Sequence, residues 1–105
     1  MDFTGLAANL GIDREDFIEL VELFINTTRN DLEKMAASLL SSDSQGAAQA
    51  AHSIKGAAGN LGFVEMAEVA KTLEMEAKED RLDGFDNGMG QLELQLGEIE
   101  NHAGL

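Results

Sequence analysis

The chain has 105 residues, 44% of them hydrophobic and 26% charged, which is enough for one domain (residues 1–105) with one core. With 20 acidic and 7 basic residues the net charge is −13, which opposes binding to nucleic acid or to an anionic membrane, so the expected partners are proteins or cations. Cysteine is absent, which excludes disulfides and thiolate metal sites, and no basic leader or long apolar run is present, so we expect a cytoplasmic protein.

Helix is favoured throughout, because proline is absent and Ala, Leu, Glu, Met and Lys dominate between the glycines. A short first helix is expected from Thr4 to Leu10, ended by Gly11 and placed at one end of a bundle. Asp13 is the expected N-cap of a long second helix, with Ile12 and Phe17 as a hydrophobic staple. The buried stripe of this helix recurs at intervals of three and four: Phe17, Val21, Phe24, Thr28, Leu32, Met35 and Leu39.

Three more helices are expected in the second half of the chain. Ser42 to Gln45 has the S-x-x-Q form of a capping box and opens a helix that ends at Gly62. The next helix has the stripe Phe63, Met66, Ala70, Leu73 and Ala77, and the pattern breaks at Leu82, Asp83 and Gly84. The last helix has the stripe Phe85, Met89, Leu92, Leu96, Ile99 and Ala103. Four long amphipathic helices with short turns predict an all-α, antiparallel up-down four-helix bundle with a short extra N-terminal helix.

The stretch from Ala51 to Gly62 carries the candidate chemistry. At about 100° per residue, Lys55, Gly56 and Gly59 share the helix face of His52. The opposite face carries the core stripe Ala47, Ile54, Ala58 and Leu61. His52 is therefore predicted to point away from the core, where an imidazole can act as a nucleophile toward phosphorus.

The neighbours of His52 suit a phosphoryl group. The Lys55 ammonium, one turn on, is placed to offset the charge of phosphoryl oxygens. Gly56 and Gly59 each cost about 1 kcal/mol of helix propensity relative to alanine, which indicates close approach by a partner. The alternative is a plain solvated histidine with glycines that serve helix packing, but packing glycines should face the core. Gly62 needs no role beyond ending the helix.

The stretch H-S-I-K-G-A-A-G-N-L-G-F resembles the H-x-x-K-G signature of histidine-containing phosphotransfer (HPt) domains, and the resemblance covers the helical layout of residues 10–105. It implies a phosphocarrier that is not an enzyme by itself. His52 would accept a phosphoryl group from the aspartate of a response-regulator receiver domain, or from a histidine kinase, and pass it to another receiver. The receiver would supply the aspartate, a lysine and Mg²⁺, so no cofactor is expected on this chain.

The stretch is also similar to the phosphoacceptor domain of chemotaxis histidine kinases, where a histidine and a glutamate on the next helix tune the reactive imidazole. Glu74 matches that glutamate, but Lys71 occupies the place of the histidine, which argues against direct phosphorylation by a kinase domain. Glu74 is placed to hydrogen-bond His52 and fix its tautomer. It also precedes Lys78 by four residues, the spacing of an ordinary surface pair, and this second interpretation is slightly favoured.

Two further predictions concern the surface. Gln45, Ala48 and Gln49 lie on the His52 face one and two turns earlier, and are expected to form a rim on which a receiver docks. His102 has no lysine or glycine pattern and is expected to be solvated or to cap its helix.

Two other functional classes remain open. A carboxylate-rich metal bundle is disfavoured, because there is no Glu-x-x-His pair, the chain has only two histidines, and the core stripes contain no carboxylates, so no metal site is expected. A non-phosphorylated adaptor that binds or sequesters a receiver through the same face is compatible with the sequence. A monomer is expected.

Overall fold

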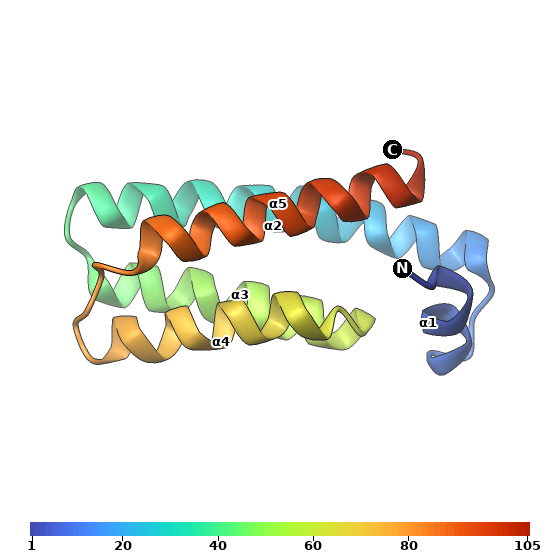
Figure 1. The fold of residues 1–105 in the computed structure, drawn as a ribbon, viewed down its shortest axis with the longest axis horizontal. Helices are drawn as coiled ribbons and strands as arrows, with labels where there is room; N and C mark the ends of the chain where they lie inside the picture. The colour runs from blue at the N-terminus through green and yellow to red at the C-terminus, as the bar shows by residue number, and fades with distance from the viewer.

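The structure, a computed structural model, describes residues 1–105 and contains five helices and no strand. They are α1 (Phe3–Asn9), α2 (Arg14–Leu40), α3 (Ser44–Leu61), α4 (Val64–Lys78) and α5 (Phe85–Ala103). Helices α2 to α5 run alternately in opposite directions, and α1 lies at the end of the bundle where α2 begins and α5 ends (Figure 1). The predicted antiparallel four-helix bundle with a short N-terminal helix is confirmed. None of the helices is both long and apolar enough to cross a membrane.

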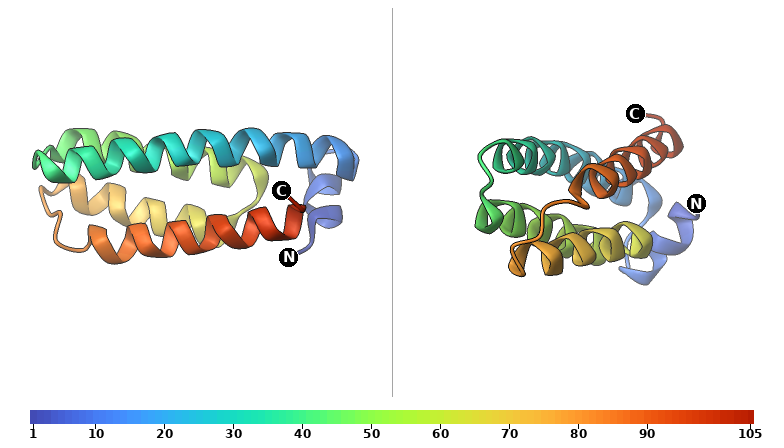
Figure 2. Two further views of the ribbon diagram at one scale, coloured as in Figure 1. Left: turned by 90° about the horizontal axis from the view of Figure 1, so that it is seen from above. Right: turned by 60° about the vertical axis from the view of Figure 1, so that its left-hand side comes forward.

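The turns are divided between the two ends of the bundle. The α2–α3 and α4–α5 turns lie together at one end, and the α3–α4 turn lies at the other end with α1 (Figure 2). A hydrogen bond from the Ser44 hydroxyl to the Asp80 carboxylate joins the first of these turns to the second. Arg29 and Glu100 form an exposed ion pair between α2 and α5.

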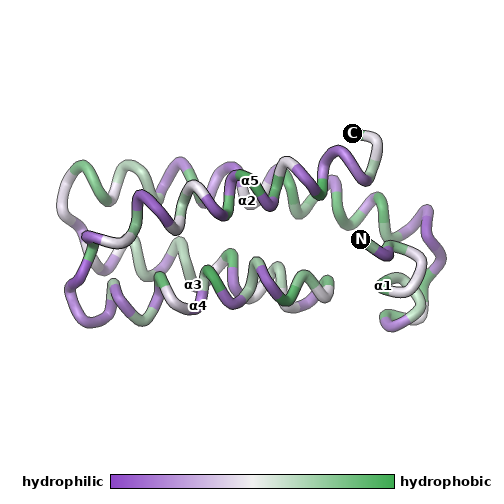
Figure 3. The backbone as a smooth tube through the Cα atoms, in the orientation of Figure 1, coloured by the Kyte–Doolittle hydropathy of each residue, from purple (hydrophilic) through white to green (hydrophobic).

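One cluster of 24 buried hydrophobic residues forms the core. The predicted stripes supply most of it, and along each helix hydrophobic and hydrophilic segments alternate, as Figure 3 shows. Leu39, Met89 and Ala103, which the stripes include, are only partly buried. The expectation that no carboxylate lies among the core residues is wrong, because Asp31 and Glu74 are 6% and 4% exposed.

Aspartates cap the first three helices. The Asp2 carboxylate accepts a hydrogen bond from the Gly5 amide at 2.9 Å, so α1 begins at Phe3, one residue before the predicted start. Asp13 accepts from the Asp16 amide at 2.8 Å, as its predicted N-cap role requires.

The predicted capping box at Ser42 and Gln45 is wrong. Ser42 has a left-handed φ of +54° and belongs to the turn that ends α2, where the Asp43 amide donates back to the Ser38 carbonyl at 2.8 Å. A residue in that conformation cannot occupy the N-cap position, which has non-helical, typically extended geometry. Asp43 is the N-cap instead, and its carboxylate accepts from the amide three residues later at 3.0 Å.

Glycines end the helices where the sequence predicted. Gly11 and Gly62 have φ values of +73° and +88°, in the left-handed region that glycine occupies without steric cost. Gly62 also faces the Leu6 side chain of α1, since an added Cβ would lie 2.8 Å from its Cδ2 atom. The α3–α4 turn therefore needs glycine at this position both for its left-handed backbone and for its close contact with α1.

Candidate functional site

His52 lies in the middle of α3 with its side chain 67% exposed. The predicted core stripe of this helix, Ala47, Ile54, Ala58 and Leu61, is buried on the opposite side. The predicted outward direction of the imidazole is therefore confirmed. The helix face decides this direction, because the apolar residues of α3 must pack against the rest of the core.

Glu74 of α4 lies beneath the imidazole. Its side chain is only 5% exposed, and its Oε2 atom is 2.8 Å from Nδ1 of His52. The predicted pair with Lys78 is present, with Nζ 3.2 Å from the same oxygen. The preference for an ordinary surface pair is nevertheless wrong, because Glu74 is buried and contacts the histidine as well. The sequence spacing could have predicted this burial. Glu74 follows Ala70 by four residues and precedes Ala77 by three, and both alanines are core residues.

Lys55 contacts the other oxygen of the same carboxylate. Its Nζ atom is 2.7 Å from Oε1 of Glu74, and its side chain is 34% exposed. Lys55 therefore lies beside His52, as the one-turn spacing predicted, but in this state its ammonium is paired with Glu74. Three donors, two of them lysines, converge on one buried carboxylate.

The protonation state of Glu74 follows from these contacts. Burial by itself raises the pKa of the carboxyl group, but hydrogen bonds from Lys55, Lys78 and His52, together with the charge of Lys55, outweigh it and lower the pKa to about 2. The group is thus ionised at neutral pH.

An ionised carboxylate is only an acceptor of hydrogen bonds, so it determines the tautomer of the ring it contacts. Nδ1 of His52 must carry the hydrogen that it donates to Glu74. In the neutral ring the lone pair is then on Nε2, which makes no hydrogen bond within the chain and belongs to a side chain that is two-thirds exposed. The arrangement presents a nucleophilic nitrogen to solvent.

Gly56 and Gly59 are exposed on the His52 face, and an added Cβ at either would meet nothing within 4 Å. Gly88 is different, because its Cβ would lie 2.5 Å from a methyl carbon of Leu73, so that glycine permits close packing of α5 on α4. Packing within this chain therefore does not account for Gly56 or Gly59. Open space above them is what approach by another molecule requires.

A groove between α3 and α4 extends from His52 toward the start of α3. The residues lining it include the three predicted rim residues, of which Gln45 and Gln49 are exposed and Ala48 is largely buried. Glu74 and Lys78 line the same groove. The structure thus brings the predicted rim and the histidine together on one continuous surface.

One contact beside the histidine was not predicted from the sequence. The Ser53 hydroxyl donates to Oδ2 of the buried Asp31 at 2.6 Å, which joins α3 to α2 next to His52. The signal was present, because Asp31 follows Thr28 by three residues and precedes Met35 by four, the spacing of the α2 stripe. A charged residue on an apolar stripe indicated a buried acceptor that needs a donor.

The two other residues considered in the sequence lie outside this arrangement. Lys71, which occupies the place of the second histidine of the chemotaxis domains, is exposed and takes part in none of the ion pairs with Glu74. His102 is exposed in the last turn of α5, as predicted, but its ring also packs edge-on against Phe3 of α1 with centroids 4.7 Å apart.

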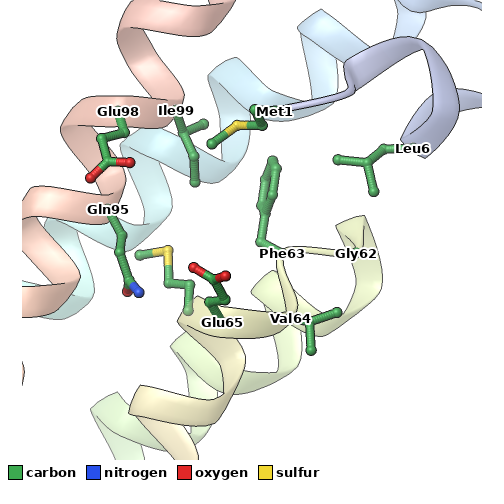
Figure 4. Close-up of a pocket in the computed structure, with 10 residues that line it drawn as sticks. Met1, Leu6, Gly62, Phe63, Val64, Glu65, Gln95, Glu98 and Ile99 are labelled. Carbon is green, nitrogen blue, oxygen red and sulfur yellow. The ribbon is translucent and has the colours of Figure 1, made fainter.

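A second pocket lies where α1, the α3–α4 turn and α5 meet, as Figure 4 shows. Most of its lining is apolar, with Phe63 at its centre and Gln95 at one side. It contains no histidine, lysine or arginine, and so lacks the nucleophile and the cations found at His52. Elsewhere, no three His, Asp or Glu side chains converge as metal ligands would.

Comparisons with known proteins agree with this geometry. The family model of the Hpt domain matches residues 19–102. Among solved structures, the histidine-containing phosphotransfer protein B (HptB) of Pseudomonas aeruginosa PAO1 superposes with a TM-score of 0.84 and 26% sequence identity, over 93% of this chain and 85% of that one. No curated protein matches the sequence significantly.

Proposed function

The chain belongs to the Hpt domain family of histidine phosphotransfer proteins, and from this premise we propose that it is a phosphorelay intermediate that carries a phosphoryl group on Nε2 of His52. The group would come from the aspartate of one receiver domain, or from a hybrid histidine kinase, and pass to the aspartate of another receiver. The observation that carries the proposal is the 2.8 Å contact between Nδ1 of His52 and the ionised Glu74, which places the lone pair of the neutral ring on Nε2 in a side chain that is largely exposed.

The transfer balances without a catalytic base on this chain. The Nε2 lone pair forms a bond to phosphorus while the bond from phosphorus to the receiver's aspartyl oxygen breaks, and its electron pair returns to that carboxylate. The ring keeps its Nδ1 hydrogen and becomes positively charged, and the Glu74 carboxylate stabilises this charge through the hydrogen bond it already accepts. Donation to the next receiver reverses these changes, so His52 is a carrier and the chain is no enzyme by itself.

The remaining site residues serve the approach of the receiver. Lys55 is expected to turn from Glu74 toward the phosphoryl oxygens, since a dianion attracts an ammonium more strongly than a carboxylate does. Gly56 and Gly59 leave space for the loops around the receiver's aspartate. Gln45, Ala48 and Gln49 form the neutral side of the docking groove. We assign Mg²⁺ to the receiver, where it would neutralise charge on the phosphoryl oxygens.

The test is phosphotransfer from a panel of ³²P-labelled receiver domains to the wild-type protein, to His52→Gln and to His102→Gln. We expect an acid-labile, alkali-stable label on the wild type and on His102→Gln, and none on His52→Gln. Equal label on His52→Gln would overturn the proposal. Tight binding of a receiver without any transfer would also overturn it, in favour of the non-phosphorylated adaptor.

A further inference from the structure

We propose that Lys78 is a second phosphate-binding cation of the His52 site, which Glu74 holds beside the imidazole until the phosphoryl group arrives. The inference rests on the proposed function and deepens it, because it adds to Lys55 a second phosphate-binding residue on the neighbouring helix. Lys78 lies outside the H-x-x-K-G stretch, so the sequence motif does not indicate this role.

The first observation is the position of the two lysines around the Glu74 carboxylate. Nζ of Lys78 is 3.2 Å from Oε2 of Glu74, the same oxygen that lies 2.8 Å from Nδ1 of His52, so the ammonium lies within about 6 Å of the ring nitrogen. Nζ of Lys55 contacts the other oxygen, Oε1, at 2.7 Å. The two ammonium groups therefore bind different oxygens of Glu74, and Lys78 shares the oxygen of the histidine.

The second observation is that the Lys78 side chain is free to move away from Glu74. It is 66% exposed, whereas that of Lys55 is 34% exposed, and it lines the groove that contains His52. Water solvates the exposed Lys78 ammonium on its outer side, so its contact with Glu74 is more easily exchanged than that of the half-buried Lys55. The four-carbon stem lets the ammonium swing while its backbone stays in α4.

The third observation is the net charge of the side chains around His52. Two lysines against one ionised carboxylate leave one excess positive charge in a protein whose net charge is −13. A phosphoryl group brings a charge of about −1.5 to −2 at pH 7, of which the excess positive charge offsets one unit. Glu74 does not become an unpaired buried charge when the two lysines turn to the phosphoryl group, because it still accepts the hydrogen bond from Nδ1 of His52, whose ring is then positively charged.

The experiment uses potassium phosphoramidate, a small donor that removes any dependence on a partner. The Nε2 lone pair of His52 forms a bond to phosphorus while the phosphorus–nitrogen bond of the donor breaks, and ammonia leaves with its electron pair. The variants are Lys78→Gln, Lys78→Arg and Arg14→Gln. Arg14 is exposed at the start of α2, about 25 Å along that helix from Asp31, so its substitution removes one charge far from the site.

The readout is the ³¹P chemical shift of the phosphohistidine as a function of pH, which reports the second ionisation of the phosphoryl group. A cation within reach favours the dianion and lowers this pKa. We expect Lys78→Gln to raise it by about 0.5 relative to wild type, and Lys78→Arg and Arg14→Gln to leave it near the wild-type value. A lysine that only held Glu74 in place would not move this titration.

A second measurement needs no variant. On phosphorylation of the wild type, the ¹⁵N resonance of Lys78 Nζ should shift, while that of Lys34 on α2 should not. An unchanged Lys78 resonance, or equal ³¹P titrations of wild type and Lys78→Gln, would overturn the inference and leave the proposed function standing. Failure of phosphoramidate to label His52 in the wild type would overturn both, since the acceptor itself would then be absent.

Discussion

The two histidines of this chain lie at exposed positions on helices, yet their surroundings differ completely. His52, in the middle of α3, contacts a buried carboxylate that two lysines also contact. His102, in the last turn of α5, packs against the ring of Phe3 and has no ionic partner within hydrogen-bonding distance. Exposure alone therefore does not distinguish the two histidines, but their partners do, because only His52 meets an ionised carboxylate.

The difference also shows how a buried charge is kept in a small bundle. Glu74 is paired with donors from α3 and from its own helix, so its desolvation is offset. The Arg29–Glu100 pair on the α2–α5 side is exposed and is expected to contribute little. Ionic contacts on the His52 side thus surround the imidazole, whereas the pair on the other side only joins two helices.

The largest effect is expected from replacing the carboxylate behind His52. Glu74→Gln removes the charge that holds hydrogen on Nδ1, and a hydrogen bond to a charged group contributes about 1.5–3 kcal/mol. Labelling of His52 by phosphoramidate should therefore slow about 10- to 100-fold. Long-range ¹⁵N–¹H spectra of the imidazole should show Nε2-protonated ring in the variant and Nδ1-protonated ring in the wild type.

Glu98→Gln is the matched control, because Glu98 precedes His102 by four residues and the substitution removes the same charge. It should leave both the rate and the tautomer of His52 unchanged. A Glu74→Gln protein that reacts as fast as wild type would remove the distinction between the two histidines.

The same carboxylate predicts a smaller effect on stability in acid. Its pKa is lowered on folding from 4.5 to about 2, so its contribution to stability is present above pH 4.5 and is lost as the pH falls toward 2. Urea unfolding of wild type and Glu74→Gln should show a difference in free energy of unfolding that shrinks over this range by about 1–2 kcal/mol, discounted because Lys78 and His52 are largely exposed. A difference that stays constant from pH 6 to pH 2.5 would contradict the proposed pairing.

Replacing either glycine beside His52 with alanine should raise the stability of the protein and slow phosphotransfer. Gly56→Ala and Gly59→Ala meet open space, so each should stabilise the helix by up to about 1 kcal/mol. Both should slow transfer from a receiver while labelling by phosphoramidate stays the same, because only the receiver needs the space. Gly90 of α5 is also exposed with open space above it, and Gly90→Ala should stabilise the protein without slowing transfer. Equal transfer in all three variants would show that the glycines are not needed for docking.

The smallest effect is expected at the second histidine. His102→Ala loses an exposed aromatic contact with Phe3 and a favourable position near a helix C-terminus, for a destabilisation below about 1 kcal/mol. Thermal unfolding should shift by a few degrees, and the phosphotransfer rate should not change. A loss of transfer would mean that the α1 end of the bundle takes part in docking.

Much of the fold and part of the site followed from local patterns. The apolar stripes of α2 and α5 predicted helices and their buried faces, because side chains three and four residues apart share a face of any helix. The same rule placed His52 outward, with Lys55 one turn on. Gly62 was recognisable as a terminator, because only glycine adopts its backbone conformation without cost.

The start of α3 shows the limit of such patterns. Ser42 and Asp43 are both good capping residues, and the sequence alone does not tell which of them occupies the N-cap position. The way α2 ends decides this, since Ser42 takes the left-handed conformation that closes that helix. One residue of difference in the preceding turn moves the whole capping arrangement.

By itself, the sequence determined the helices, their inner faces and the outward direction of the His52 imidazole, because these depend on residues within a few positions of one another. Only the tertiary structure decided that Glu74 is buried against His52 and that Ser53 meets Asp31, because these contacts join helices whose relative rotation and height are set by packing of the whole core. The tautomer of His52, and with it the nitrogen that we propose carries the phosphoryl group, therefore depends on how α4 packs against α3.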